Sequence, residues 1–204
     1  MALSGGALAE LHTEMRACRK CLEAGYPITP GAVFSGPASA RVMIIGQAPG
    51  VTEAQVKRPF NASSGTRLFQ WLAHAGWDEG AFRARHYMSA VTKCYPGKGT
   101  GGKGDRVPTR AEQGLCRPFL EQELALIAPQ VILPVGRLAI ELFYGRGIKL
   151  SDVVGTSKID DRGRWIVPLP HPSGASLWLN QPAHAAQVSQ ALKILRALKE
   201  ELAL

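Results

Sequence analysis

The sequence lacks any apolar run that approaches the ~20 residues needed to cross a membrane. Its first six residues also lack the charged region and apolar core of a secretion signal. We therefore expect a cytoplasmic protein with no membrane partner. Because thiols stay reduced in that compartment, the four cysteines of the chain do not suggest a disulfide framework. Their presence raises the question of a metal site or of catalysis.

Acidic residues are few, since 16 Asp and Glu stand against 24 Lys and Arg and leave a formal net charge of +8. Such a surplus suits a polyanionic partner such as nucleic acid, although a merely soluble basic protein would show the same charge. Internal repeats and long linkers are lacking too. We therefore predict a single domain over residues 1–204.

Short apolar runs alternate with segments of helical spacing along the chain. We expect strands at 41–45, 87–91, 131–135 and 165–169, and helices at 7–21, 66–75, 110–128, 137–143 and 183–202. Residues 148–154 and the turn at 160–163 indicate one further, short pairing of strands. This order predicts an α/β fold, in which a mostly parallel four-stranded central sheet is flanked by helices on both faces.

The segment Gly46-Gln47-Ala48-Pro49-Gly50 directly follows the first predicted strand. Two glycines and a proline in five positions can neither continue a strand nor start a regular helix, so the backbone must turn sharply there. Ligands of open α/β sheets bind at the carboxyl ends of strands. An ordinary exit from a strand is the alternative, and the other motifs decide between the two.

The four cysteines all lie near the ends or starts of predicted elements. Cys18 and Cys21 form a Cys-x-x-Cys pair, Cys94 follows the second strand, and Cys116 lies in the long helix after a glycine-rich loop. Four thiolates suit tetrahedral zinc or an iron–sulfur cluster, and their spacing does not separate the two. Four unrelated buried thiols are the remaining alternative.

Six motifs in order resemble the uracil-DNA glycosylase superfamily, most closely its family 4, the iron–sulfur type. They are Cys18-x-x-Cys21, Gly46 to Gly50, Arg58-Pro59-Phe60 with Gly65, Lys93-Cys94, Cys116 to Leu120, and His171-Pro172-Ser173. The resemblance implies a 4Fe–4S cluster, rather than zinc, held by Cys18, Cys21, Cys94 and Cys116.

The resemblance also implies an enzyme that flips uracil, or a related deaminated base, out of DNA and hydrolyses its N-glycosidic bond. It assigns His171 to the departing base, because a donor there stabilises the developing anion. Phe60 is expected to lie beneath the flipped base. Close backbone contacts are expected from Gly46, Ala48 and Gly50.

Three positions differ from the families that this sequence resembles. Family 4 generally carries a carboxylate at the position of Gln47, and family 1 carries an aspartate at Ala48, where alanine is the family 5 pattern. Related enzymes often have an asparagine at Ala90 that reads the uracil edge. An amide at Gln47 can orient a water but cannot accept its proton. We expect relaxed base specificity, weak activity, or a replacement carboxylate, for which Glu53 is the candidate.

The DNA partner is expected to contact the segment around the histidine motif, and the protein is expected to act as a monomer. Small hydroxyl residues and free backbone N–H groups suit phosphates, and a bulky apolar side chain can enter the gap left by the base. The predicted DNA-binding residues are Lys93, Pro172, Ser173, Gly174, Ser176 and Trp178, with Lys98, Lys103 and Arg106 of the glycine-rich loop.

Two other functions stay open at this level. A binding protein of the same fold would recognise damaged DNA with little or no glycosylase activity, and Gln47, Ala48 and Ala90 keep this alternative open. A metal-stabilised α/β hydrolase of soluble nucleotides would gain nothing from a base placed within a DNA strand.

Overall fold

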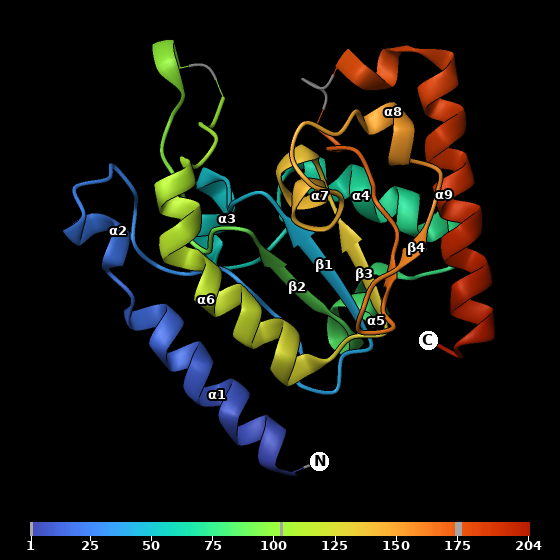
Figure 1. The fold of residues 1–204 in the computed structure, drawn as a ribbon. Coiled ribbons are helices and arrows are strands. Elements are labelled where there is room, and N and C mark those ends of the chain that lie inside the picture. Colours follow the sequence, from blue (N-terminus) through green and yellow to red (C-terminus); the bar gives the residue numbers. More distant parts are fainter. Residues whose placement is uncertain (1, 103, 174–176) are drawn as a thin grey trace.

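The computed structural model describes residues 2–102, 104–173 and 177–204. Its centre is a sheet with the strand order β2-β1-β3-β5-β4, in which β1, β2, β3 and β5 are parallel and β4 is antiparallel to β5 (Figure 1). The predicted, mostly parallel α/β sheet is confirmed. The strands are β1 (Val42–Gly46), β2 (Tyr87–Ala90), β3 (Val131–Pro134), β4 (Lys158–Ile159) and β5 (Trp165–Ile166).

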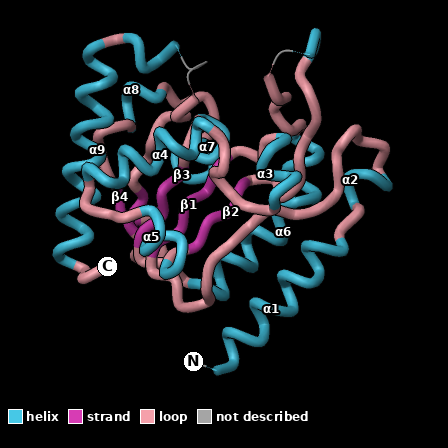
Figure 2. The backbone as a smooth tube through the Cα atoms, turned by 180° about the vertical axis from the view of Figure 1, so that it is seen from behind, coloured by secondary structure: helices cyan, strands magenta, loops and turns pink. Residues whose placement is uncertain are grey.

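Helices cover both faces of the sheet, as predicted. Helices α1 and α6 lie side by side on one face (Figure 1), and the view from behind shows α4, α5 and α9 on the other (Figure 2). The helices are α1 (Ala2–Ala17), α2 (Lys20–Glu23), α3 (Val51–Val56), α4 (Ser63–His74), α5 (Glu79–Arg85), α6 (Arg110–Ile127), α7 (Arg137–Tyr144), α8 (Leu150–Val153) and α9 (Pro182–Glu201), with 3₁₀ turns η1 (Thr100–Gly102) and η2 (Leu177–Asn180). Across the described ranges, none of these helices has both the length and the apolar character of a membrane span.

Strand β1 is apolar along its whole length because both of its faces are covered. Val42 and Ile44 pack into the cluster formed with α4, α5 and α9, whereas Met43 and Ile45 pack into the cluster formed with α1, α6 and α7. All four side chains are fully buried. Parallel strands covered on both faces read as continuous apolar runs, which is why this strand is visible in the sequence.

The predicted number of four strands is wrong, because β4 adds a fifth strand at the edge. It pairs with β5 across the predicted turn, where the Asp160 carboxylate accepts hydrogen bonds from the backbone N–H groups of Arg162 and Arg164 at 3.0 and 2.9 Å. The proposed arm at 148–154 instead contains the short helix α8. The two residues of β4 are only partly buried or exposed, so hydrophobic periodicity gave no sign of the strand.

His86 is a buried histidine at the end of α5, packed against the rings of Phe82 and Trp77. Burial lowers the pKa of His86 to about 4 from 6.5, and the nearby positive charge of Arg85 adds to the effect. Below pH 6.5 the unfolded chain therefore binds a proton that the folded chain does not bind. Stability from the neutral imidazole is complete above pH 6.5 and is lost as the pH falls toward 4.

We predict that His86→Phe, which keeps the aromatic packing, flattens this acid dependence. Between pH 7.5 and pH 5 the wild type should lose about 2 kcal/mol of unfolding free energy through this group, and the variant should not. Urea unfolding at the two pH values measures the difference. Equal losses in both proteins would show that His86 does not titrate in this way.

Candidate functional site

The carboxyl ends of the parallel strands lie together at one end of the sheet, which is here called its carboxyl edge (Figure 1). The register pairs Gly46 of β1 with Ala90 of β2, and a further parallel bridge joins Val135, just after β3, to Leu169, beyond β5. The glycine turn, the end of β2 and the histidine segment therefore converge. This is the edge at which open α/β sheets bind ligands.

A pocket of about 450 Å³ opens at this edge. It brings together the predicted catalytic residues and all but one of the predicted base-pocket residues, Gly50 being the exception. Its lining consists of Val33, Gly46, Gln47, Ala48, Pro49, Glu53, Pro59, Phe60, Ser64, Ser89, Ala90, Val135 and His171.

Neighbouring residues hold the backbone of Phe60, and its ring lies close to Gly46. A Cβ atom at Gly46 would lie 3.1 Å from the ring, and one at Gly65 would clash with the Phe60 carbonyl oxygen. Arg83 of α5 donates hydrogen bonds to the carbonyl oxygens of Pro59 and Phe60 at 2.9 and 2.8 Å. Phe60 itself has a left-handed φ of 52°. The sequence analysis missed Arg83 because it did not predict α5.

Two carboxylates flank the glycine turn. Glu53 accepts a hydrogen bond from the backbone N–H of Gly50 at 2.6 Å, which caps the start of α3. A Cβ atom at residue 50 would lie 3.1 Å from Oδ2 of Asp105, whose Oδ1 accepts a hydrogen bond from the Tyr95 hydroxyl at 3.0 Å. For the glycine-rich loop the sequence predicted only basic DNA-binding residues, so this acidic contact with the glycine turn was missed.

The hydrogen bonds of His171 select its tautomer. Nδ1 lies 2.9 Å from the Ser173 hydroxyl, which can donate or accept, and 3.2 Å from the backbone N–H of Ser173, which can only donate. These contacts favour Nδ1 as the acceptor and Nε2 as the nitrogen that carries the proton in the neutral ring. Gly136 lets the ring approach closely, since a Cβ there would lie 3.3 Å from Cδ2. Although the residue is exposed overall, desolvation of the ring lowers the pKa of His171 below its usual range.

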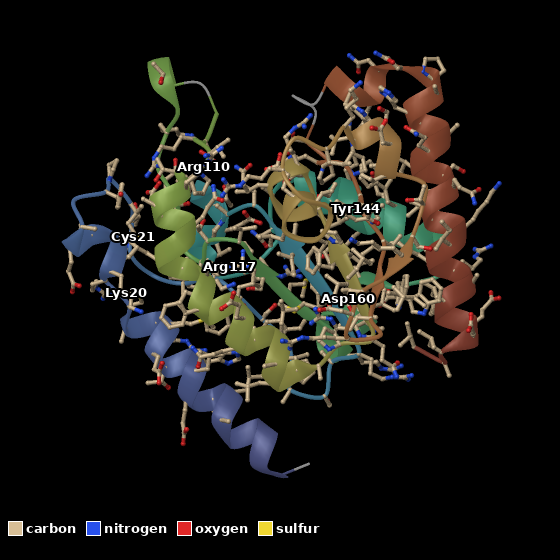
Figure 3. The ribbon with its side chains drawn as sticks, viewed as in Figure 1. Lys20, Cys21, Arg110, Arg117, Tyr144 and Asp160 are labelled. Carbon is tan, nitrogen blue, oxygen red and sulfur yellow. The ribbon has the colours of Figure 1, made fainter. Side chains whose placement is uncertain are left out.

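The four cysteines line a second cavity, of about 490 Å³, on the α1 and α6 side of the sheet. Figure 3 shows Cys21 on the α2 side of α6. All four are free thiols, and burial, reinforced by the neighbouring thiols, raises the pKa of Cys21 to about 11. Among the described residues, no group of three or more Cys, His, Asp or Glu side chains is arranged to hold a single metal ion.

All four cysteines line this one cavity, and thiolates are ligands of both iron–sulfur clusters and zinc. The backbone N–H of Lys93 donates to Cys116 Sγ at 3.3 Å, a contact of the kind that supports cluster sulfurs. Burial, with a smaller contribution from the neighbouring thiols, raises the pKa of Cys21 and of Cys94 to about 11, so a positive group beside them would favour their thiolate forms.

Two basic residues predicted to contact DNA face inward instead. Lys93 is only 2% exposed, and its ammonium lies 2.6 Å from a Glu123 carboxylate oxygen, so its prediction as a DNA contact is wrong. Arg106 donates to both oxygens of Glu112, at 2.7 and 2.5 Å. Lys98 is exposed and lies 3.4 Å from Asp105. A lysine just before a cysteine and an arginine inside a charged loop give no sign of such pairing in the sequence.

The histidine segment is described only in part. Pro172 is buried, Ser173 is partly buried, and the indole of Trp178 is stacked on the His184 ring with centroids 4.0 Å apart. This stacking argues against Trp178 as a free wedge in DNA. Gly174 and Ser176 lie outside the described residues, as does Lys103 of the glycine-rich loop.

We predict opposite effects for alanine at two helical glycines. Gly65→Ala places its methyl group against the Phe60 carbonyl and should lower the unfolding free energy by roughly 1–3 kcal/mol. Gly114→Ala is the matched control, because nothing lies within 4 Å of its added Cβ, and it should raise stability by roughly 0.5–1 kcal/mol. Chemical denaturation measures both. A stabilising Gly65→Ala would show that Phe60 is not held as described.

Comparison with known proteins agrees with this geometry. The family description "Uracil DNA glycosylase superfamily" matches residues 33–195. The Type-4 uracil-DNA glycosylase of Pyrobaculum aerophilum is 32% identical over 154 residues, which cover 72% of each chain. Those of Thermotoga maritima and Archaeoglobus fulgidus are 30% and 28% identical, with 69% and 81% of each chain covered. The chain belongs to the uracil-DNA glycosylase superfamily.

Proposed function

We propose that this protein is a DNA repair glycosylase, acting as one domain. It flips uracil, or a related deaminated base, out of DNA and hydrolyses the N-glycosidic bond, leaving an abasic site. The observation that carries the proposal is that His171, Gln47 and Phe60, from three distant segments, line one pocket at the carboxyl edge of the sheet. The family of the chain and the names of its relatives support it.

The reaction breaks the bond between C1′ of the sugar and the base nitrogen. The electron pair leaves with the base, so negative charge grows on uracil and positive charge grows on the sugar. Water then supplies a hydroxyl to C1′ and a proton to the departed base. The protein must therefore stabilise an anion in the pocket and admit one water beside the sugar.

His171 acts on the departing base. With Nδ1 occupied by the Ser173 N–H, the neutral ring offers Nε2–H as its donor. Its lowered pKa keeps it neutral, and a neutral donor stabilises a uracil oxygen without first needing to be charged. Phe60 supplies the flat surface beneath the base, fixed by Gly46 and Arg83.

The sugar side of the pocket carries weak bases only. Gln47 can orient the water through its amide but cannot accept a proton. The Glu53 carboxylate lines the pocket but already accepts the Gly50 N–H. We therefore propose dissociative chemistry, in which the glycosidic bond breaks before the water attacks, and in which Glu53 and the DNA phosphates stabilise the sugar cation.

The side chains expected to face the hydrogen-bonding edge of the base are small and apolar. Ala48 and Ala90 line the pocket, and neither side chain can form a hydrogen bond with a base. Gly46 and Gly50 allow close backbone approach. We expect relaxed discrimination among uracil, hypoxanthine and xanthine in consequence. Ser173, with Gly174 and Ser176, is proposed to hold the phosphates beside the flipped nucleotide, whereas Pro172, which is buried and has no N–H, is proposed only to shape the segment.

We further propose that Cys18, Cys21, Cys94 and Cys116 hold a 4Fe–4S cluster. The support is their common cavity, the burial of Cys116 and partial burial of the other three thiols, and the hydrogen bond from Lys93 N–H to Cys116. A bound cluster would link α2 and α6 to the segments that follow α1 and β2. The proposed chemistry uses no electron transfer.

We predict that His171→Ala lowers kcat for uracil excision by roughly 100-fold or more, the range seen when a preorganised donor to a developing anion is removed. Gln47→Ala should lower kcat by less than about tenfold, because the amide only orients the water. Alkaline cleavage of a labelled oligonucleotide containing uracil measures both. A larger loss at Gln47 contradicts the dissociative mechanism, and binding without cleavage by the wild type indicates a damage-binding protein instead.

Loading of the cysteine cavity is tested separately from activity. Purified protein should show broad visible absorption and about four irons per chain, and Cys116→Ser should lower both. Elemental analysis separates iron from zinc, since zinc would give no visible band. One zinc per chain with no iron would overturn the cluster assignment and leave the glycosylase proposal standing.

A further inference from the structure

Lys93 lies between the two cavities and contacts the wall of each. Its backbone N–H donates to Cys116 of the cysteine cavity at 3.3 Å. Its ammonium donates to the carbonyl oxygen of Ala90 at 2.6 Å and to the hydroxyl of Ser89 at 2.8 Å, and both of these residues line the base pocket. One buried side chain thus fixes the end of the strand that forms part of the pocket.

The counter-charge comes from Glu123 of α6, which is fully buried. Its carboxylate lies 2.6 Å from the Lys93 ammonium and accepts hydrogen bonds from the hydroxyls of Ser89 and Tyr87 at 3.0 Å. Tyr87 in turn lies 2.7 Å from Nε2 of His12 on α1. The buried polar network therefore links β2 to α6 and α1, and its donors and acceptors are matched within the described residues.

Stability alone does not account for this arrangement. Removing a lysine and a glutamate from water is costly, and well-packed apolar residues of similar volume often serve a core equally well or better. What apolar residues cannot do is hold a carbonyl and a hydroxyl in one orientation. The network does so at the carboxyl end of β2, an edge strand, where Ala90 has no further strand beyond it to fix its carbonyl.

We propose that Lys93 and Glu123 are positioning residues of the base pocket, which hold the end of β2 in the orientation that accepts the flipped base. The proposal rests on the proposed function. It matters in this chain because residue 90 is alanine and offers no hydrogen bond of its own, so the backbone must be placed by other groups. Neither residue touches the base.

The test uses Lys93→Met combined with Glu123→Gln. The double variant removes both charges together and keeps an acceptor for Ser89 and Tyr87, whereas either single change leaves an unpaired buried charge. We expect it to unfold cooperatively and to keep the visible spectrum and iron content of the wild type. We expect kcat on uracil-containing DNA to fall at least tenfold and inhibition by free uracil to weaken at least tenfold. The Kd for DNA should change less than about twofold.

The matched control is the ion pair between Asp160 and Arg164, whose side chains are 11% and 13% exposed and 2.6 Å apart. Asp160 follows β4, which forms the opposite edge of the sheet from β2, and it lies apart from Cys21 in Figure 3. Asp160→Asn combined with Arg164→Met should lower stability and leave kcat and uracil inhibition unchanged. The comparison separates loss of an ion pair from loss of pocket geometry.

A folded Lys93→Met, Glu123→Gln variant with the kcat and uracil inhibition of the wild type overturns this inference alone. A wild type that excises no uracil overturns the proposed function. If the double variant does not fold, Tyr87→Phe removes one donor to Glu123 and leaves both charges in place. It should lower kcat several-fold at unchanged DNA affinity, and an unchanged kcat overturns the inference.

Discussion

The parallel register of β1 with its two neighbours is the constraint on which the rest of the structure depends. It places Gly46 opposite Ala90 and sets the segments that follow β3 and β5 at the same edge. The register is held because β1 buries side chains on both faces, and a shift by one residue would exchange the two apolar clusters. The strand ends thereby bring Gly46, Ala90, Val135 and the histidine segment into one pocket.

Helix α6 connects the two cavities on one face of the sheet. It carries Cys116 and, seven residues later, Glu123, so both side chains point toward β2 two turns apart. The cysteine cavity and the base pocket therefore share one rigid element and one lysine.

The sequence predicted the strands whose side chains are buried on both faces of the sheet, and the residues that belong to recognisable motifs. Continuous apolar runs such as β1 revealed the parallel strands, and the motifs predicted that His171 and Phe60 meet in one pocket. It missed β4, which has two residues and no apolar pattern, and the pairings of Lys93 and Arg83. A lysine or arginine looks the same in the sequence whether it faces solvent or pairs with a buried carboxylate. Such pairings are therefore visible only in the tertiary structure.

The backbone of Phe60 has a consequence for which residues this position can accept. Its φ of 52° favours glycine or asparagine and is uncommon for a bulky side chain, so a phenylalanine there is held against its local preference. A phenylalanine that only filled the core would gain nothing from this backbone strain. Substitution of Phe60 by glycine or asparagine should therefore relieve the strain and remove the ring at the same time. In this chain the unfavourable backbone conformation at residue 60 accompanies a ring that lines the base pocket.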